Sequence, residues 1–168
     1  MNSSELLLTR RIQNKERRNR EEFLTMIDGD LQHLMRNAVF IYGNDIPESI
    51  SNSFIDIQSG SNLNNPIRLE FDDIELLLDE LPQKTETNKS GYLSLGSIYP
   101  IFKVNIDEVF DYIADLTLKI NDFDRYYLIS DDVKNGLIIT EYVGYLPKER
   151  QTNNREIVYS LIYWGFGS

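Results

Sequence analysis

The stretch that decides the fold covers residues 126–146 and reads YYLISDDVKNGLIITEYVGYL. Its two ends, residues 126–129 and 137–146, are rich in β-branched and aromatic residues, and a polar segment separates them. Asparagine and glycine both tolerate positive φ, so Asn135-Gly136 predicts a tight hairpin turn between two antiparallel strands. Residues 157–164 are apolar at nearly every position, which predicts a final strand that is covered on both faces and central in the sheet.

The segment before this region predicts a helix over residues 106–120. Asn105 can cap its first turn, and Glu108 stands three residues further on, as in a capping box. Lys119 lies near the C-terminal end, where positive charge is favourable. Apolar residues recur at spacings of three and four and predict one buried face, made of Ile106, Val109, Phe110, Ile113, Leu116 and Ile120.

Helices also dominate the N-terminal half. Pro47 is expected at the first position of a short helix over residues 47–57, although the alternation at residues 54–57 also fits a strand. Residues 67–71 predict a strand, and Asp72 or Asp73 then starts a helix that ends near Leu81. Before these, a helical face is predicted from Phe23, Ile27, Leu31, Leu34, Met35 and Ala38.

These elements predict an α+β fold. N-terminal helices precede a mostly antiparallel sheet, which ends in a C-terminal β-hairpin and a final central strand. The length of 168 residues fits a single domain over residues 1–168. Within it, we expect a basic helical stretch at residues 1–20 with frayed first residues, and an acidic globular body at residues 21–168.

Charge is divided unevenly between these two parts. Residues 1–20 hold six basic and two acidic groups, for a net charge of +4, and the remainder of the chain carries −14. Such a body attracts basic proteins and repels nucleic acid and anionic lipid, so we expect no nucleic-acid or membrane partner. The N-terminus has no basic region followed by a long apolar run, and a cytoplasmic location is therefore expected.

The chain offers few groups for familiar chemistry. It has no cysteine and one histidine, His33, which the helical pattern marks as a residue without a catalytic role. No glycine-rich phosphate loop occurs, and Asp131-Asp132 does not continue with the spacing of a calcium-binding loop. We therefore predict no catalytic residue, no cofactor and no metal site.

Carboxylates and tyrosines are the candidates for binding a partner. Asp107, Asp111 and Asp115 repeat every four residues on the outer face of the predicted 106–120 helix, so they form the first candidate surface. A solvated helix face is the alternative. The C-terminal sheet is rich in tyrosine, an interface residue that also packs well in sheets. The remaining candidates are Asp72, Asp73, Glu75 and Asp79 of the preceding helix, with Tyr126 and Tyr142 of the sheet.

Residues 123–132, FDRYYLISDD, followed by residues 136–141, GLIITE, resemble the strand–turn–strand of small bacterial immunity proteins of contact-dependent and other polymorphic toxin systems. The resemblance covers roughly residues 98–146. It implies a small acidic cytoplasmic protein that neutralises one cognate toxin domain, often a basic nuclease, and it transfers no individual residue. Two other functions are left open: a regulatory or structural module that self-associates through its N-terminal helix and tyrosine-rich sheet, and an enzyme that uses carboxylates.

Overall fold

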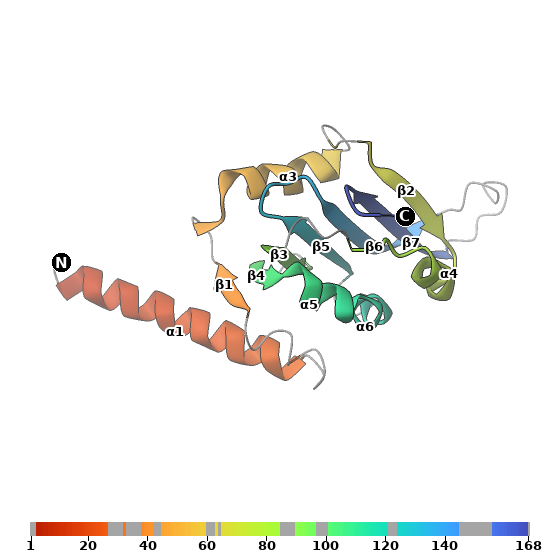
Figure 1. Cartoon of the computed structure of the whole chain (residues 1–168). Helices are drawn as coiled ribbons and strands as arrows, with labels where there is room; N and C mark the ends of the chain where they lie inside the picture. The colour runs from red at the N-terminus through yellow and green to blue at the C-terminus, as the bar shows by residue number, and fades with distance from the viewer. Residues whose placement is uncertain are drawn as a thin grey trace. The chain divides into compact units, whose positions relative to one another are not determined.

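The structure is a computed structural model, and it describes residues 3–26, 32, 38–41, 45–59, 63, 65–84, 90–96, 101–120, 124–144 and 156–167. The chain divides into two compact units, Met1–Asn37 and Ala38–Ser168. The first unit contains one long helix, α1 (Ser3–Met26), which includes the whole basic stretch from Ser3 onward (Figure 1). Ile27, Leu31, Leu34 and Met35 of the predicted helical face, and His33 beside them, lie outside the described residues.

The second unit is built on a seven-stranded sheet in which every neighbouring pair is antiparallel. This arrangement confirms the predicted α+β class. Ala38 is buried and lies outside any helix, just before the first strand, so its assignment to a helix was wrong. Across the sheet the strands follow the order β1 (Val39–Ile41), β4 (Ile101–Asn105), β3 (Ser90–Leu95), β5 (Arg125–Ser130), β6 (Gly136–Gly144), β7 (Glu156–Trp164) and β2 (Ile67–Phe71).

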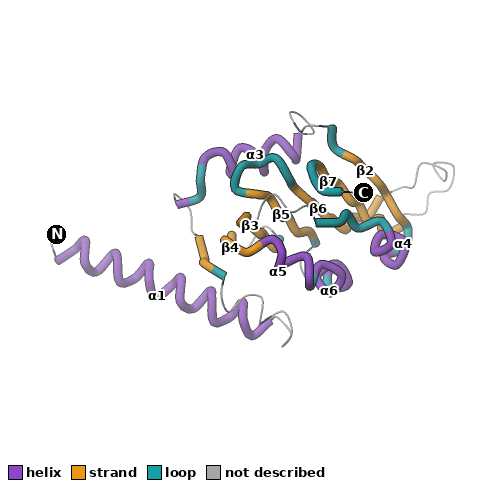
Figure 2. Tube along the Cα trace, viewed as in Figure 1, coloured by secondary structure: helices purple, strands orange, loops and turns teal. Residues whose placement is uncertain are grey.

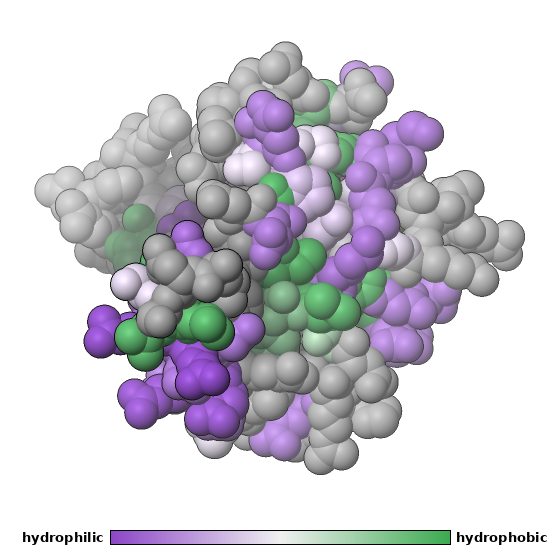
Figure 3. Space-filling view, turned by 90° about the vertical axis from the view of Figure 1, so that its left-hand side faces the viewer, coloured by the Kyte–Doolittle hydropathy of each residue, from purple (hydrophilic) through white to green (hydrophobic). Residues whose placement is uncertain are grey.

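The last strand, β7, is an internal strand, because β6 pairs with it on one side and β2 on the other. Its apolar composition therefore indicated correctly that it has two neighbours. It nevertheless lies one place from the edge, and β5 lies nearer the middle of the sheet. At the opposite edge lies β1, where Val39 keeps 60% of its surface exposed, and the described surface as a whole carries both hydrophilic and hydrophobic side chains (Figure 3).

Helices lie over both faces of the sheet (Figures 1 and 2). One face is covered by α3 (Glu48–Ser59), whose Ile50 is buried in a cluster with Tyr127 and Ile129 of β5. Side chains alternate along a strand, so Tyr126 points to the opposite face. That face is covered by the helices α4 (Ile74–Asp79), α5 (Ile106–Asp111) and α6 (Ile113–Leu118).

The structure decides the open assignment at residues 54–57, which belong to α3 and are helical. Pro47 is not the first helical residue. Its carbonyl oxygen accepts a hydrogen bond of 3.0 Å from the Ser51 N–H, so it is the residue that precedes and caps the helix. The predicted strand at residues 67–71 is confirmed as β2, and the helix after it begins at the capping residue Asp73 and ends at Asp79.

The helix predicted over residues 106–120 forms, but as two pieces. Asn105 caps α5 as expected, and its side chain accepts a hydrogen bond from the Asp107 N–H. At Tyr112 the backbone leaves the helical conformation, with φ −119° and ψ 11°, and α6 starts afresh. Phe110, Tyr112 and Ile113 at the break are aromatic or β-branched, types that lose side-chain freedom in a helix and so make its interruption less costly.

The hairpin between β5 and β6 is confirmed, but the predicted Asn135-Gly136 turn is wrong. Neither residue has a positive φ, and Gly136 already pairs with Ile129 as the first residue of β6. The chain reverses over residues 131–135, where Val133 takes the left-handed conformation with φ 61°. Ser130 closes this loop, because its N–H donates to the Asn135 carbonyl at 2.9 Å.

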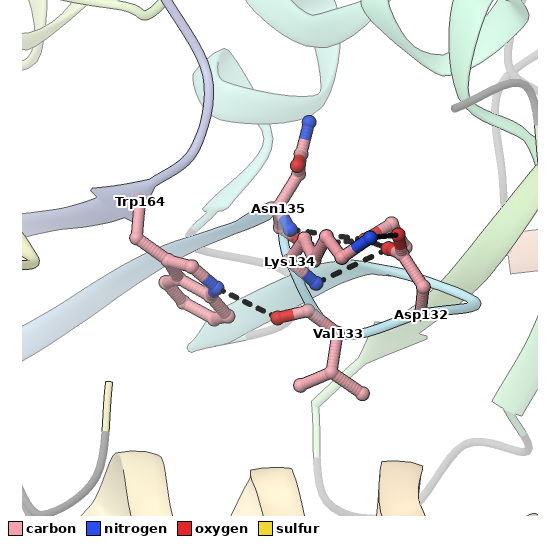
Figure 4. A network of polar contacts seen from close by, with 6 residues as sticks. Asp132, Val133, Lys134, Asn135 and Trp164 are labelled. Atoms are coloured by element: carbon pink, nitrogen blue, oxygen red, sulfur yellow. Dashed lines mark hydrogen bonds and ion pairs between the residues drawn. The ribbon is translucent and has the colours of Figure 1, made fainter. Parts of the chain in front are cut away.

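Side chains rather than a two-residue turn hold this loop (Figure 4). The indole N–H of Trp164 donates to the Val133 carbonyl at 3.1 Å, across from β7. The Asp132 carboxylate accepts from the Lys134 N–H at 3.2 Å. Glycine is needed at position 136 for lack of space and not for its φ, because a Cβ there would overlap the Trp164 ring.

This contact generates a stability prediction. We expect Gly136→Ala to lower the free energy of unfolding by about 1–3 kcal/mol, because the added methyl group overpacks the Trp164 site. Gly167→Ala is the control, since the nearest atom to its added Cβ would be 3.7 Å away. Urea unfolding of the two variants measures the difference. An equal effect in both would contradict the role assigned to the ring contact.

Candidate functional site

The two acidic segments predicted as separate surfaces lie in one helical layer. In the structure α4 contacts α6, and α6 contacts α5, on the same face of the sheet. Their apolar sides, including Leu77, Val109 and Leu116, are buried. The carboxylates of both segments are therefore left on the outer side, although residues 81–106 separate the segments along the chain.

Two large apolar side chains are exposed in the same helices. Leu76 of α4 and Leu118 of α6 each keep 51% of their surface accessible, although Leu77 and Thr117 beside them are fully buried. We name this surface the acidic layer. It consists of nine carboxylate residues and the two leucines: Asp72, Asp73, Glu75, Leu76, Asp79, Glu80, Asp107, Glu108, Asp111, Asp115 and Leu118.

Lys84 partly neutralises one side of this layer. Its Nζ lies 3.9 Å from a carboxylate oxygen of Asp107 and 3.9 Å from one of Asp111. The neighbouring Gln83 is fixed by paired backbone hydrogen bonds to Gly167, of 2.8 and 3.1 Å, which hold this segment next to the chain end. All three charged side chains keep at least 40% of their surface accessible, so each ion pair contributes little energy.

The break at Tyr112 changes the first candidate surface. Asp107 and Asp111 belong to α5, and Asp115 belongs to α6, so the three do not form one continuous helical row. Asp72 and Asp73 precede α4, and the side chain of Asp73 is engaged as its cap, accepting from the Glu75 N–H at 2.8 Å. All the predicted carboxylates nevertheless lie on the acidic layer.

The prediction that Tyr126 contacts a partner was wrong. This tyrosine is fully buried between β5 and α6, and its hydroxyl lies 2.8 Å from the hydroxyl of Thr117. Thr117 also donates to the Ile113 carbonyl at 2.7 Å. Burial raises the pKa of Tyr126 well above its usual range. Tyr126 therefore fastens α6 to the sheet and is inaccessible to another protein.

Tyr142 is accessible but lies on the other face of the sheet. Tyr142 lies four residues after Ile138 in β6, so both side chains point to the same face, and Ile138 belongs to the core cluster beneath α3. The Tyr142 side chain keeps 41% of its surface exposed. Its hydroxyl donates to Glu70 at 2.8 Å. Partial burial, together with the hydrogen bond and charge of Glu70, raises the pKa of Tyr142 to about 12. Tyr142 is therefore not part of the acidic layer.

A pair of variants distinguishes these two tyrosines. We expect Tyr126→Phe to lower the free energy of unfolding by about 1–2 kcal/mol, because a buried hydrogen bond is lost. Tyr142→Phe should change it by less than about 0.5 kcal/mol, as is usual for exposed positions. Chemical denaturation measures both. A larger loss for Tyr142→Phe would contradict the assignment of Tyr126 as the structural residue.

One further carboxylate, Glu141, was not predicted as a site residue. Its Oε2 is buried and has no hydrogen-bond partner among the residues that the structure describes. Burial raises the pKa of Glu141, and the nearby charge of Asp124 adds to the increase. The pKa of Tyr159 is also raised, by burial and by the charges of Glu141 and Asp73. No signal in the sequence marked this site, because Glu141 lies in a strand whose residues are partly buried and partly exposed.

Glu141 generates a pH prediction. Its raised pKa means that the folded state binds the proton more tightly than the unfolded chain, so stability falls as pH rises through that pKa. We expect Glu141→Gln to raise the unfolding midpoint at about pH 7 and to have little effect near pH 4, where glutamate is largely protonated.

The control for this experiment is Glu80→Gln, which removes an exposed carboxylate of the acidic layer. It should have a much smaller effect at neutral pH, because no burial opposes its charge. Urea unfolding at both pH values provides the comparison. A gain from Glu141→Gln that is equal at both pH values would contradict the charge-burial explanation.

Two searches of the described residues bear on the type of site. No group of three or more histidine, cysteine, aspartate or glutamate side chains among them is placed to hold a metal ion. None of the helices in the described part of the chain is long and apolar enough to cross a membrane.

Fold and surface together define a small antiparallel α+β protein with an outward-facing acidic layer. The chain belongs to the YokC prophage protein family, whose family model matches residues 1–163. No curated protein and no solved structure shows significant similarity to it.

Proposed function

We propose that this chain is a non-catalytic binding protein that docks a basic protein on its acidic layer. The observation that carries this proposal is that two acidic segments, distant in the sequence, lie in one layer of contacting helices, which also exposes Leu76 and Leu118. Carboxylates together with exposed apolar side chains are the composition expected where complementary charge guides association and buried apolar contact supplies affinity.

The partner that fits best is a toxin, and the chain then acts as its immunity protein. A nuclease toxin needs a positively charged cleft for phosphates, and an acidic surface docked there blocks substrate binding. Membership of a prophage family and the net charge of −10 are consistent with this role. The immunity function rests further on the resemblance of residues 98–146 to immunity proteins.

An enzymatic use of the same carboxylates is less well supported. Catalytic acids and bases work at shifted pKa values in sites that exclude water. Eight of the nine carboxylates in the acidic layer are exposed, and Asp107 is half-buried. Such an arrangement favours contact with another molecule's charges over proton transfer.

The test compares two variants with equal net charge. Asp79→Asn with Asp115→Asn removes two charges from the acidic layer, and Asp45→Asn with Glu48→Gln removes two exposed charges elsewhere. Each tagged full-length protein is used to capture partners from a lysate of the native bacterial host. We expect a basic protein to be retained by the wild type and by the second variant, and to be lost from the first.

The purified complex then tests the mechanism and the toxin identity. The association rate should fall as salt rises, because charge steering is screened. Expression of the partner alone should arrest growth, and the wild type should relieve that arrest where the Asp79→Asn, Asp115→Asn variant fails. Capture of the same partner by both variants, or a partner that is not basic, would overturn the proposal.

A further inference from the structure

The helix α1 exposes apolar side chains that have no role within the helix. Leu6, Leu7, Leu8 and Ile12 keep between 41% and 60% of their surface accessible. Helices in isolation are marginal in water, and most helical stability in proteins comes from packing of an apolar face. Leu8 and Ile12, four residues apart, share one side of this 24-residue helix, so that side has the character of a surface that packs against another one.

The same helix presents a basic side. Arg11, Lys15 and Arg18 follow one another at spacings of four and three, which align them along one face. Arg10 and Arg17, seven residues apart, form a parallel line next to them. All five side chains are exposed, and Arg17 forms an exposed ion pair of 3.8 Å with Glu21 on the same helix.

The acidic layer is the complementary surface that this chain itself supplies. It offers nine carboxylates with Leu76 and Leu118, and α1 offers five exposed bases with four aliphatic residues. An acidic surface attracts a basic helix at long range, and apolar contact then holds it. Nucleic acid and anionic lipid, the other anionic partners for such a helix, are repelled by the −14 charge of residues 21–168.

We propose that α1 of one copy docks on the acidic layer of a second copy, so that the protein self-associates through its basic helix. In a two-fold dimer each copy would donate one helix and accept one, which closes the assembly. Self-association occupies the surface that the proposed function assigns to a foreign basic partner, but it does not depend on the existence of that partner. The dimer would be a stored form from which the partner displaces α1.

Charge reversal on the two surfaces tests the proposal with the full-length protein. One variant carries Arg11→Glu and Arg18→Glu, and the other carries Asp79→Lys and Asp115→Lys. Sedimentation equilibrium gives the mass of each. We expect the wild type to dimerise at about 50 mM salt and to dissociate at about 500 mM, where exposed charges are strongly screened.

Each variant alone should dimerise at least about tenfold more weakly, because like charges then face each other. An equimolar mixture of the two should recover a dimer, since the glutamates introduced on α1 of one chain meet the lysines introduced on the acidic layer of the other. Thr9→Glu is the control, because it adds negative charge on the side of α1 opposite to Arg11 and Arg18, away from the substituted positions. This control should dimerise like the wild type.

Several results would overturn the proposal. A wild type that stays monomeric at about 100 µM in low salt excludes a second copy as the occupant, since a contact of useful strength is occupied well below that concentration. Failure of the mixture to recover the dimer excludes the pairing of these two surfaces. Binding of a short DNA duplex or of phosphatidylserine vesicles by a monomeric wild type, lost with Arg11→Glu and Arg18→Glu, would assign α1 to those partners.

The result can be separated from the proposed function. Sedimentation uses the purified chain alone, whereas the capture experiment reports a foreign protein. A monomeric wild type that still captures a basic protein through Asp79 and Asp115 would remove the self-association and leave the binding function intact. A wild type that dimerises but captures no basic protein would support the self-association and remove the proposed binding function.

Discussion

The whole second unit depends on the burial of β5 on both faces. Every residue of this strand except Arg125 is buried, and successive side chains point alternately to the two helical layers. Tyr127 and Ile129 pack in the cluster that contains Ile50 of α3. Tyr126, on the other side, shares a buried hydrogen bond with Thr117 of α6. A helix can be lost from neither face without exposing this strand.

The acidic layer owes its position to these internal contacts and not to its own charges. Leu116 and Thr117 hold α6 on the sheet, and Phe110 of α5 packs edge-on against Phe166 with ring centres 4.9 Å apart. Among the described residues, the outer carboxylates have no structural contact besides the cap formed by Asp73 and the weak pairs with Lys84. Substitutions on that outer side are therefore expected to test the proposed binding without unfolding the protein.

The sequence was sufficient where the cause is local. The apolar spacing of residues 106–120 and the cap at Asn105 were predicted correctly, and the start of α4 was narrowed to Asp72 or Asp73, because each signal acts within one or two helical turns. The turn at Asn135-Gly136 was predicted wrongly, because Gly136 is required by its contact with the ring of Trp164, which lies 28 positions further along the chain. The predicted exposure of Tyr126 was wrong for the same reason, because a strand pattern shows which residues share a face but not which face a helix covers. The union of the two acidic segments depends on strand order, which no local pattern encodes.

The position of β2 has a consequence for synthesis of the protein. Within the described sheet β2 pairs with β7 alone, so β2 waits for a strand that is synthesised about 90 residues later. Gln83 likewise waits for Gly167. Contacts of such long sequence separation slow folding and leave an apolar edge unpaired in the interval. The sheet can therefore close around β2 only after β7 has been synthesised, and the apolar edge must stay protected until then.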